Sequence, residues 1–249
     1  MRFTFFVKRC KTLRRSEVKN LFITGTDTAV GKTVVSRALL QYLARAGLSA
    51  VGFKPVARNA VPGAEGLRSK DALVLQSSST LDLPYSAINP LIYEEDEVST
   101  RPHEPMDYAL LSSSLHRLQQ QADCVVTEGT GGWRSLMNDA KPLSGWVAQH
   151  QLPVVLVVGI KQGCLNHALL TAEAIGRDGL PLAGWVANRI NPGLAHYAEL
   201  ISVLSDNISA PLLGELPYLP RAEQRDLAGY LDLTSLGVAP VPVSGAKIA

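Results

Sequence analysis

The sequence contains few cysteines and no pair of them at the spacing of a metal or redox motif. Its three cysteines are Cys10, Cys124 and Cys164, and no CxxC motif occurs. An odd number of separated cysteines argues against a disulfide framework and against a structural zinc site. This usage is typical of a reducing compartment, so we expect a cytoplasmic protein.

A strong charge imbalance and long apolar runs are also missing. The formal net charge is +2, too small to favour binding to nucleic acid or to a membrane surface. No apolar run approaches the ~18 residues that a membrane span requires. Of the 249 residues, 46% are hydrophobic and 18% are charged, which suffices for one α/β domain with a full core. We therefore expect neither a nucleic-acid nor a membrane partner.

Residues 1–19 form a basic stretch ahead of the first predicted strand. Its apolar part, residues 3–7, is too short for the core of a signal peptide, and no small-residue cleavage site follows. We interpret the stretch as a non-native start or a disordered arm, with an organellar transit peptide as the alternative. The chain is accordingly divided into this extension, a domain at residues 20–235 and a flexible tail at 236–249.

Apolar runs and helical periodicity alternate along the domain. Strands are predicted at residues 21–24, 50–53, 124–127, 153–158, 183–187 and 212–216. Helices are predicted at residues 32–46, 71–76, 108–121, 165–177 and 194–204. Residues 84–105, rich in Pro, Asp and Glu, are predicted to form a loop over one edge. The alternation predicts a single-domain α/β fold with a doubly wound parallel sheet.

The segment GTDTAVGKT, residues 25–33, lies between the first predicted strand and the first predicted helix. Glycines here let backbone N–H groups wrap around phosphate oxygens, and the helix N-terminus adds partial positive charge. Lys32 can reach the β- and γ-phosphates of a nucleotide, and the Thr33 hydroxyl can ligate Mg²⁺. Five residues separate Gly25 from Gly31, one more than the usual spacing. The segment predicts a P-loop NTPase-like fold; a glycine-rich turn that only caps the helix is the alternative.

Further charged residues follow the predicted strands, where ligands bind in an open parallel sheet. Lys54 follows the second strand, and Glu128 follows the third, ahead of a glycine-rich segment. Asp71 lies at a predicted helix start, where it could cap the helix or face the loop. A carboxylate at this edge can hold Mg²⁺ directly or through water. Read singly, Lys54 is equally consistent with a surface lysine, and Glu128 with a turn residue.

The remaining strand ends carry groups suited to other parts of a nucleotide or to an anion. Residues 163–166 begin a predicted helix, and a helix N-terminus favours an anion. Asn188 ends a strand, and its amide offers a donor and an acceptor that suit the edge of an adenine ring. The last strand runs into ELPYLP, residues 215–220, a rigid turn that could wall a base pocket.

Six motifs occur in order along the chain: GTDTAVGKT, GFKPVA, EGTGGW, GCLNHA, GWVAN and GELP. Together they resemble the dethiobiotin synthetase family, over about residues 22–233, and the extra residue in the phosphate loop is one that this family has. The resemblance implies a homodimeric ligase that uses ATP and Mg²⁺ to join CO₂ to 7,8-diaminononanoate. One amine becomes a carbamate, ATP phosphorylates the carbamate, and the second amine displaces phosphate to close a cyclic urea.

The resemblance also implies roles for individual residues. The catalytic residues would be Lys32 and Lys54. The ligands of Mg²⁺ would be Thr33, Asp71 and Glu128. The nucleotide would be bound by Thr28, Ala29, Val30, Gly31, Lys32, Thr33, Asp71, Glu128, Gly129, Thr130, Gly131, Asn188, Arg189, Pro217, Tyr218 and Leu219. The diamine would be bound by Thr28, Lys54 and Arg58, and its carboxylate by the partner subunit through Gly163, Cys164, Leu165 and Asn166.

Three positions depart from the family pattern. Ala29 lies where many members carry Glu, Arg58 lies where a small hydroxyl residue is common, and Thr130 lies where Ala is frequent. The charged residues of the motifs are present, so we expect a competent enzyme. The changes at Ala29 and Arg58 bear on its affinity for substrate.

Three alternative functions remain open. A ParA/MinD-like ATPase switch would carry an extra lysine early in the loop, where this sequence has Thr26 and Asp27. A cobyrinate-type amidotransferase synthetase would need a fused glutaminase domain in addition to these residues. A catalytically weak paralogue, such as a second copy of the enzyme, would bind nucleotide or a partner protein without efficient synthesis.

Overall fold

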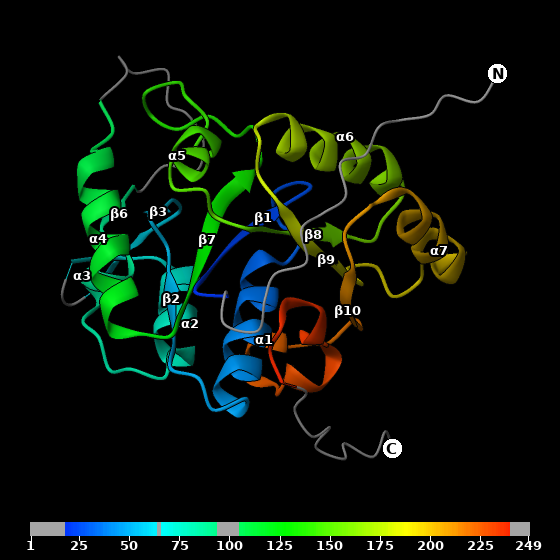
Figure 1. Ribbon diagram of the computed structural model, residues 1–249, viewed down its shortest axis with the longest axis horizontal. Coiled ribbons are helices and arrows are strands. Elements are labelled where there is room, and N and C mark those ends of the chain that lie inside the picture. Colours follow the sequence, from blue (N-terminus) through cyan, green and yellow to red (C-terminus); the bar gives the residue numbers. More distant parts are fainter. Residues whose placement is uncertain (1–17, 64–65, 94–104, 240–249) are drawn as a thin grey trace.

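The computed structural model describes residues 18–63, 66–93 and 105–239 (Figure 1). Most of the basic extension, the last ten residues of the tail and residues 94–104 of the predicted loop lie outside these ranges. The interpretation of the extension as a disordered arm or a non-native start therefore stays a prediction.

The described residues form a six-stranded sheet at the centre of the domain. Its strands are β1 (Asn20–Gly25), β2 (Ala50–Phe53), β7 (Cys124–Gly132), β8 (Val154–Gly159), β9 (Leu182–Asn188) and β10 (Leu212–Leu216). From one edge to the other the order is β10, β9, β8, β1, β7 and β2, and each neighbouring pair is parallel. Figure 1 shows β1 inside the sheet, between β7 and β8. The strand order reverses direction around β1, which confirms the predicted doubly wound α/β fold.

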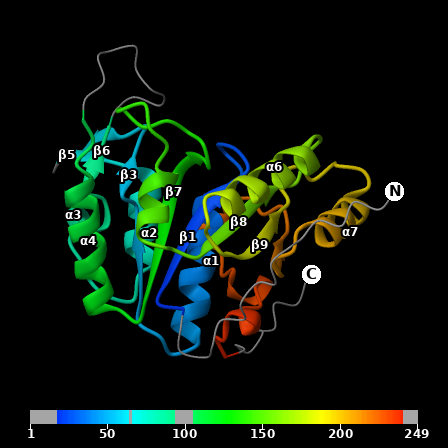
Figure 2. The same ribbon diagram turned by 45° about the horizontal axis from the view of Figure 1, so that its top comes forward.

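Helices cover both faces of this sheet. They include α1 (Lys32–Arg45), α2 (Lys70–Ser78), α4 (Tyr108–Gln121), α5 (Ser144–Gln149), α6 (Cys164–Arg177) and α7 (Tyr197–Asn207). Figure 2 shows α1 and α6 on opposite sides of the sheet. Within the described ranges, no helix has both the length and the apolar character needed to cross a membrane.

Side chains of β8 alternate between the two faces of the sheet. Val155 and Val157 belong to the apolar cluster that contains the buried face of α1. Leu156 and Val158 belong to a second cluster, with residues of α6 and α7. A strand covered on both faces needs apolar side chains at every position, which is why this segment is a continuous β-branched and leucine run.

The loop predicted at residues 84–105 contains regular structure in its first part. One helical turn, α3 (Tyr85–Ile88), is followed by β6 (Leu91–Ile92), which pairs in parallel with β3 (Val56–Ala57). The prediction of a plain loop is therefore wrong for residues 85–92. A further short antiparallel pair is formed by β4 (Val61–Gly63) and β5 (Gly66–Arg68). Elements of two to four residues are too short to show a period, so the sequence does not predict them.

Several predicted boundaries shift, and two of the shifts concern the site. β7 continues to Gly132, so Glu128 lies inside the strand rather than at a turn. α2 begins with Ser69 as its N-cap, so Asp71 lies in the first turn and does not cap the helix. α7 begins at Tyr197, three residues later than predicted.

The C-terminal end of the described chain packs against the sheet. A 3₁₀ turn at Thr234–Leu236 precedes Val238, and both Leu236 and Val238 are buried in the cluster that contains α1. These residues fall in the segment interpreted above as tail. Packing therefore extends past residue 235 and reaches at least Val238.

Candidate active site

The phosphate loop, residues 25–33, joins β1 to α1 at the carboxyl edge of the sheet, which is the side where the carboxyl ends of the parallel strands lie. Gly31 is the N-cap of α1 with a φ of 90°, and a Cβ atom there would lie 2.0 Å from Asn188 Nδ2, so glycine is required. Lys32 begins α1 and is 8% exposed. Its ammonium donates to the backbone oxygen of Asp27 at 3.1 Å. The loop therefore places a nearly buried cation at a helix N-terminus, which suits an anion.

Lys54 and Glu128 form a buried ion pair beside this loop. Phe53 of β2 pairs with Thr127 of β7, so the next residues, Lys54 and Glu128, are neighbours across the sheet. Lys54 Nζ donates to Glu128 Oε1 at 2.7 Å and to the Gly129 oxygen at 3.1 Å. The two side chains are 3% and 0% exposed, which excludes the alternative of a surface lysine.

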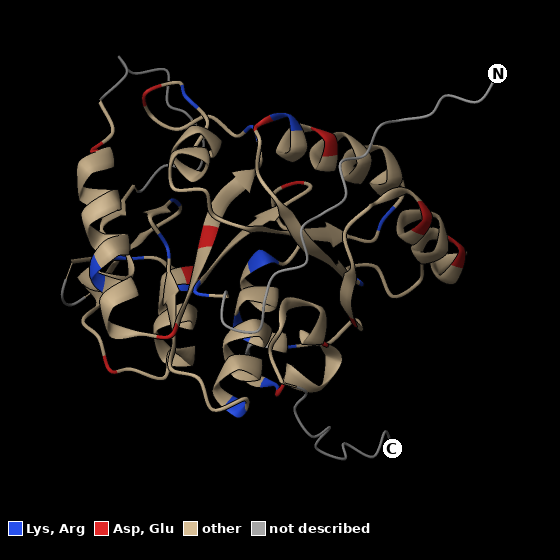
Figure 3. Ribbon diagram, viewed as in Figure 1, with Lys and Arg blue, Asp and Glu red and all other residues tan. Residues whose placement is uncertain are grey.

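Thr33 and Asp71 complete the cluster around Glu128. The Thr33 hydroxyl donates to Glu128 Oε1 at 2.9 Å, and Lys54 Nζ lies 3.4 Å from Asp71 Oδ2. Glu128 Oε2 is buried and has no hydrogen-bond partner among the described residues. In Figure 3, the ribbon of β7 carries an acidic segment and the beginning of α1 a basic one. The structure thus brings together residues that the sequence predicts at the ends of four separate elements.

The charges of this cluster set the protonation of its members. Burial, together with the nearby Lys54 ammonium, lowers the pKa of Lys32 to about 8. Burial also acts against the charged form of Lys54, but Glu128 and Asp71 outweigh it and raise the pKa of that lysine. Burial likewise acts against the Asp71 carboxylate, yet Lys54 and Thr33 hold its pKa below the ordinary value. Near pH 7 the cluster therefore contains ionised Asp71 and charged Lys54.

The oxygen atoms of Thr33, Asp71 and Glu128 fit a hard divalent cation. Mg²⁺ binds hydroxyl and carboxylate oxygens together with phosphate oxygens and water, and does not need an all-protein cage. Glu128 Oε2, buried and unpartnered in the described structure, is suited to such a cation. No three His, Cys, Asp or Glu side chains gather as metal ligands anywhere in the described ranges.

Asn188 contacts the phosphate loop directly. It is the last residue of β9, it is 7% exposed, and its Nδ2 donates to the Val30 oxygen at 2.8 Å. The amide donor that the sequence suggests for an adenine edge is therefore used by the loop. Leu216 of β10 pairs with Asn188, and its oxygen accepts from the Arg189 N–H at 2.9 Å. Residues 217–219 follow at this same edge of the sheet.

Arg58 and Thr130, two of the departures from the family pattern, hold neighbouring backbone. Arg58 Nη2 donates to the Leu136 oxygen at 2.9 Å and to Asn138 Oδ1 at 3.3 Å. The Thr130 hydroxyl donates to the Val56 oxygen and so ties β7 to β3. Both side chains thus have structural contacts beside the cluster.

Residues 163–166 begin α6, on the turn that follows β8. Gly163 is the N-cap with a φ of 83°, and the Cys164 side chain is buried. Leu165 is half-buried and Asn166 is exposed. The Cys164 N–H donates to the Lys161 oxygen at 3.1 Å, so the turn is closed by its own backbone.

The sequence reasoning missed one contact, which joins this turn to the phosphate loop. Lys161 Nζ lies 2.9 Å from Asp27 Oδ2, and Asp27 Oδ1 accepts from the Thr28 N–H at 2.8 Å. The hydrogen bond from Lys161 holds the pKa of Asp27 below its ordinary value. The available signal was the place of Lys161, two residues after the buried strand β8 and at the edge where ligands bind.

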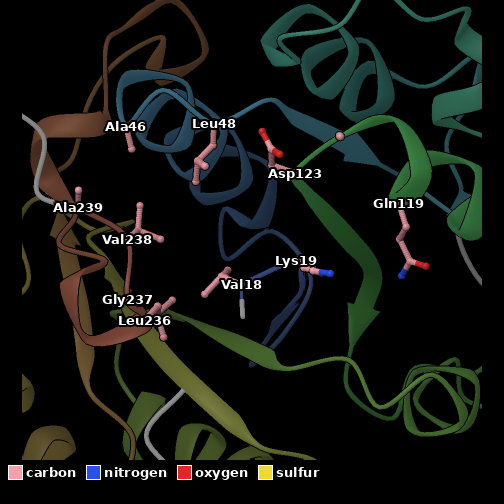
Figure 4. Close-up of a pocket in the computed structure, with 11 residues that line it drawn as sticks. Val18, Lys19, Ala46, Leu48, Gln119, Asp123, Leu236, Gly237, Val238 and Ala239 are labelled. Atoms are coloured by element: carbon pink, nitrogen blue, oxygen red, sulfur yellow. The ribbon is translucent and has the colours of Figure 1, made fainter. Parts of the chain in front are cut away.

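A pocket of about 510 Å³ lies on the other side of the sheet, at the amino ends of the strands (Figure 4). Val18 and Lys19 precede β1, Leu48 precedes β2 and Asp123 precedes β7, so the lining comes from the amino ends of strands. None of the predicted site residues lines it. The pocket and the charged cluster therefore lie at opposite ends of the strands.

Comparison with known sequences identifies close relatives. A family described as an AAA domain matches residues 19–225. The chain is 65% identical over 220 residues to ATP-dependent dethiobiotin synthetase BioD 2 of Salmonella typhimurium, covering 88% of this chain and 95% of that protein. It is 64% identical over 219 residues to the protein of the same name from Escherichia coli K12, with the same coverage. It is 52% identical over 222 residues to ATP-dependent dethiobiotin synthetase BioD of Vibrio campbellii, covering 86% and 96%.

Comparison with solved structures supports the fold alone. The MinC:MinD cell division protein complex of Aquifex aeolicus contains a chain that matches with a TM-score of 0.55 and 13% identity, over 82% of each chain. A ParA family ATPase from Chlorobium tepidum matches with a TM-score of 0.50 and 15% identity, over 90% of this chain and 94% of that one. Both similarities agree with the predicted α/β fold class.

Proposed function

The chain belongs to the family of ATP-dependent dethiobiotin synthetases, and we propose that it closes the cyclic urea of dethiobiotin at the cluster of Lys32, Lys54, Thr33, Asp71 and Glu128. Membership makes it an ATP-dependent ligase. The proposed substrates are 7,8-diaminononanoate, CO₂ and ATP. The proposed products are dethiobiotin, ADP and phosphate.

The reaction would proceed in three balanced steps. One amine of the diamine attacks CO₂ and loses a proton, which gives a carbamate. A carbamate oxygen attacks the γ-phosphorus of ATP, and ADP leaves. The second amine attacks the carbonyl carbon of this mixed anhydride and loses a proton, phosphate leaves, and the five-membered urea closes. No side chain has to act as a nucleophile, so the protein would act by positioning and by electrostatic stabilisation.

The observation that carries the proposal is the chain of contacts from Thr33 through Glu128 to Lys54. It fixes the buried ammonium of Lys54 next to the phosphate loop, with Lys32 on the loop itself. Carbamate and triphosphate are both anionic, and their approach needs cations between them. Lys32 would lie on the phosphate side and Lys54 on the carbamate side of the transferred phosphoryl group.

Mg²⁺ would be held by Thr33, Asp71 and Glu128. When bound, it would neutralise charge on the β- and γ-phosphates. Lys54 occupies Glu128 Oε1 in this structure, whereas Glu128 Oε2 is buried without a partner among the described residues. The carboxylate can therefore offer one oxygen to the cation and keep the other on Lys54.

The remaining assignments follow from the family resemblance and from position at the carboxyl edge. The adenine would bind near Asn188, Arg189 and residues 217–219, which lie together at the ends of β9 and β10. The substrate carboxylate would bind to residues 163–166 of a second copy, which makes the enzyme a homodimer. We propose a cytoplasmic enzyme on the grounds of its cysteine usage.

The test is an ADP-release assay on the full chain with Mg²⁺ and ATP. We expect ADP release only when diamine and bicarbonate are both present, with one dethiobiotin formed per ADP. ATP turnover that does not change when the diamine is omitted would contradict the proposal and would favour an ATPase switch. Nucleotide binding without any turnover would favour the weak paralogue.

A further inference from the structure

Asp27, in the phosphate loop, accepts hydrogen bonds at its carboxylate and at its backbone oxygen. Its carboxylate accepts from Lys161 Nζ at 2.9 Å and from the Thr28 N–H at 2.8 Å. Its backbone oxygen accepts from Lys32 Nζ at 3.1 Å. Asp27 therefore connects Lys161, which is 134 positions away in the sequence, to the lysine of the phosphate loop.

The segment that carries Lys161 is held beside the loop by backbone contacts. The Thr26 N–H donates to the Val157 oxygen of β8 at 3.0 Å, and the Ile160 N–H donates to the Asn188 oxygen at 2.9 Å. The ion pair thus spans two segments that the sheet already fixes next to each other. The backbone that carries Lys161 is therefore fixed next to the backbone that carries Asp27.

The charges of Asp27 and Lys161 affect how the phosphate loop binds an anion. An ionised carboxylate in a phosphate loop repels a triphosphate unless a cation lies beside it. The two side chains are 36% and 43% exposed, and a pair as exposed as this contributes little to folding stability. Its main effect is therefore on the local charge and on the orientation of Asp27.

We propose that Lys161 is a positioning residue for the nucleotide, which neutralises Asp27 and holds it in the orientation that the phosphate loop needs. The proposal rests on the proposed function in one respect, because it takes this loop as the ATP site. Lys161 acts through Asp27, without contacting the reacting atoms. It is a third lysine of the site, in addition to Lys32 and Lys54.

The test compares the affinity of full-length variants for the Mg²⁺ complex of β,γ-imido-ATP by titration calorimetry. In Lys161→Met, an unneutralised Asp27 should raise the dissociation constant about three- to tenfold. Lys161→Arg should stay within about twofold of the unmodified protein, because a cation is kept. Asp27→Asn keeps an oxygen for the Thr28 N–H, so the double variant Asp27→Asn/Lys161→Met should also return to within about twofold. Lys19→Met, at the opposite edge, is the matched control.

Steady-state kinetics supply a second readout that a purely structural role would not give. We expect Lys161→Met to raise the KM for ATP with kcat unchanged, since uniform binding is lost. Three results would overturn the proposal: an affinity in Lys161→Met equal to that of the Lys19→Met control, a loss that persists in the double variant, or a loss confined to the diamine. Nucleotide binding can be measured even if no dethiobiotin forms, so this outcome is separate from that of the proposed function.

Discussion

Lys54 shows how a single side chain can combine stability and chemistry. A buried ammonium is unfavourable by itself, and here it is stabilised by Glu128, by Asp71 and by the Gly129 oxygen. The backbone around it is also fixed, because its N–H donates to the Ile88 oxygen. A lysine held so firmly is preorganised to face an anion and does not have to reorganise when one arrives.

Replacing Lys54 should therefore affect both folding and activity. In Lys54→Met, Glu128 is left buried without its counter-charge, so we expect the free energy of unfolding to fall by about 3 kcal/mol. Ring closure should be lost as well. Urea denaturation and the ADP-release assay would measure the two effects, with Lys19→Met as the control. Unchanged stability together with near-normal synthesis would show that the role is misassigned.

Lys32 should give nucleotide binding a distinct pH dependence. Its pKa of about 8 in the free protein means that the ammonium is lost as the pH rises through 8. Phosphates favour the ammonium and raise its pKa in the complex, so binding should take up a proton above pH 8. The dissociation constant should then rise with pH, by a slope that approaches about tenfold per pH unit.

Calorimetry of β,γ-imido-ATP binding at pH 7, 8 and 9, in two buffers with different heats of ionisation, would measure this uptake. Lys32→Arg is the matched variant, because arginine stays protonated throughout and should abolish the pH dependence. An affinity that is constant from pH 7 to 9 in the unmodified protein would be incompatible with the lowered pKa.

The junction of β1, the phosphate loop and α1 depends on a contact from another strand. Asn188 at the end of β9 bonds the Val30 oxygen and fills the space beside Gly31. Side-chain and backbone atoms of distant elements thus determine the curvature of the loop. A substitution of Asn188 or of Gly31 should change the conformation of the loop more than that of the sheet.

Gly31→Ala tests this junction. A methyl group at a φ of 90° and 2.0 Å from Asn188 Nδ2 should destabilise the protein by about 1–3 kcal/mol and weaken nucleotide binding more than tenfold. Thermal melting and calorimetry would measure both. Gly176→Ala is the matched control, because that glycine lies in α6 with open space around it, and the change should stabilise the helix by about 0.5 kcal/mol. Equal effects of the two substitutions would contradict the prediction.

Elements with a long, regular pattern could be predicted from the sequence, and short or glycine-rich ones could not. Tyr108–Gln121 has the predicted bounds because helical periodicity marks it along its whole length. β7 was predicted too short because its last residues, rich in glycine, are typical of a turn. The pairing of β3 with β6 depends on tertiary contacts that leave no local pattern.

The same distinction applies to the site. Lys32, Lys54 and Glu128 could be predicted at the carboxyl ends of the strands because each follows or begins an element that the sequence predicts. The position of Lys161 after β8 indicates the edge on which it lies, but its contact with Asp27 could not be predicted, since the two residues are 134 positions apart in the sequence. The bond from Asn188 to the loop was likewise hidden, because an amide at a strand end suits either a ligand or a backbone oxygen.

The proposed dimer can be tested by complementation between two inactive variants. If residues 163–166 of one subunit bind the carboxylate at the other subunit's site, Lys32→Ala and Asn166→Asp lie in different halves of each composite site. Mixed dimers then contain one intact site, and an equal mixture should recover about a quarter of full activity. Each variant assayed alone is the control. No recovery, with mixed dimers shown to form, would place both functions within a single subunit.

The position of β1 in the sheet has a consequence for the order in which the protein acquires its activity during synthesis. Both partners of β1 are made late, since β7 begins at Cys124 and β8 at Val154, and Asn188 follows later still. The phosphate loop emerges early from the ribosome but lacks its flanking strands until most of the chain has been translated. Long-range parallel pairing of this kind is slow. A fragment that ends before β8 should therefore bind no nucleotide in equilibrium dialysis, and binding would show that the loop organises itself.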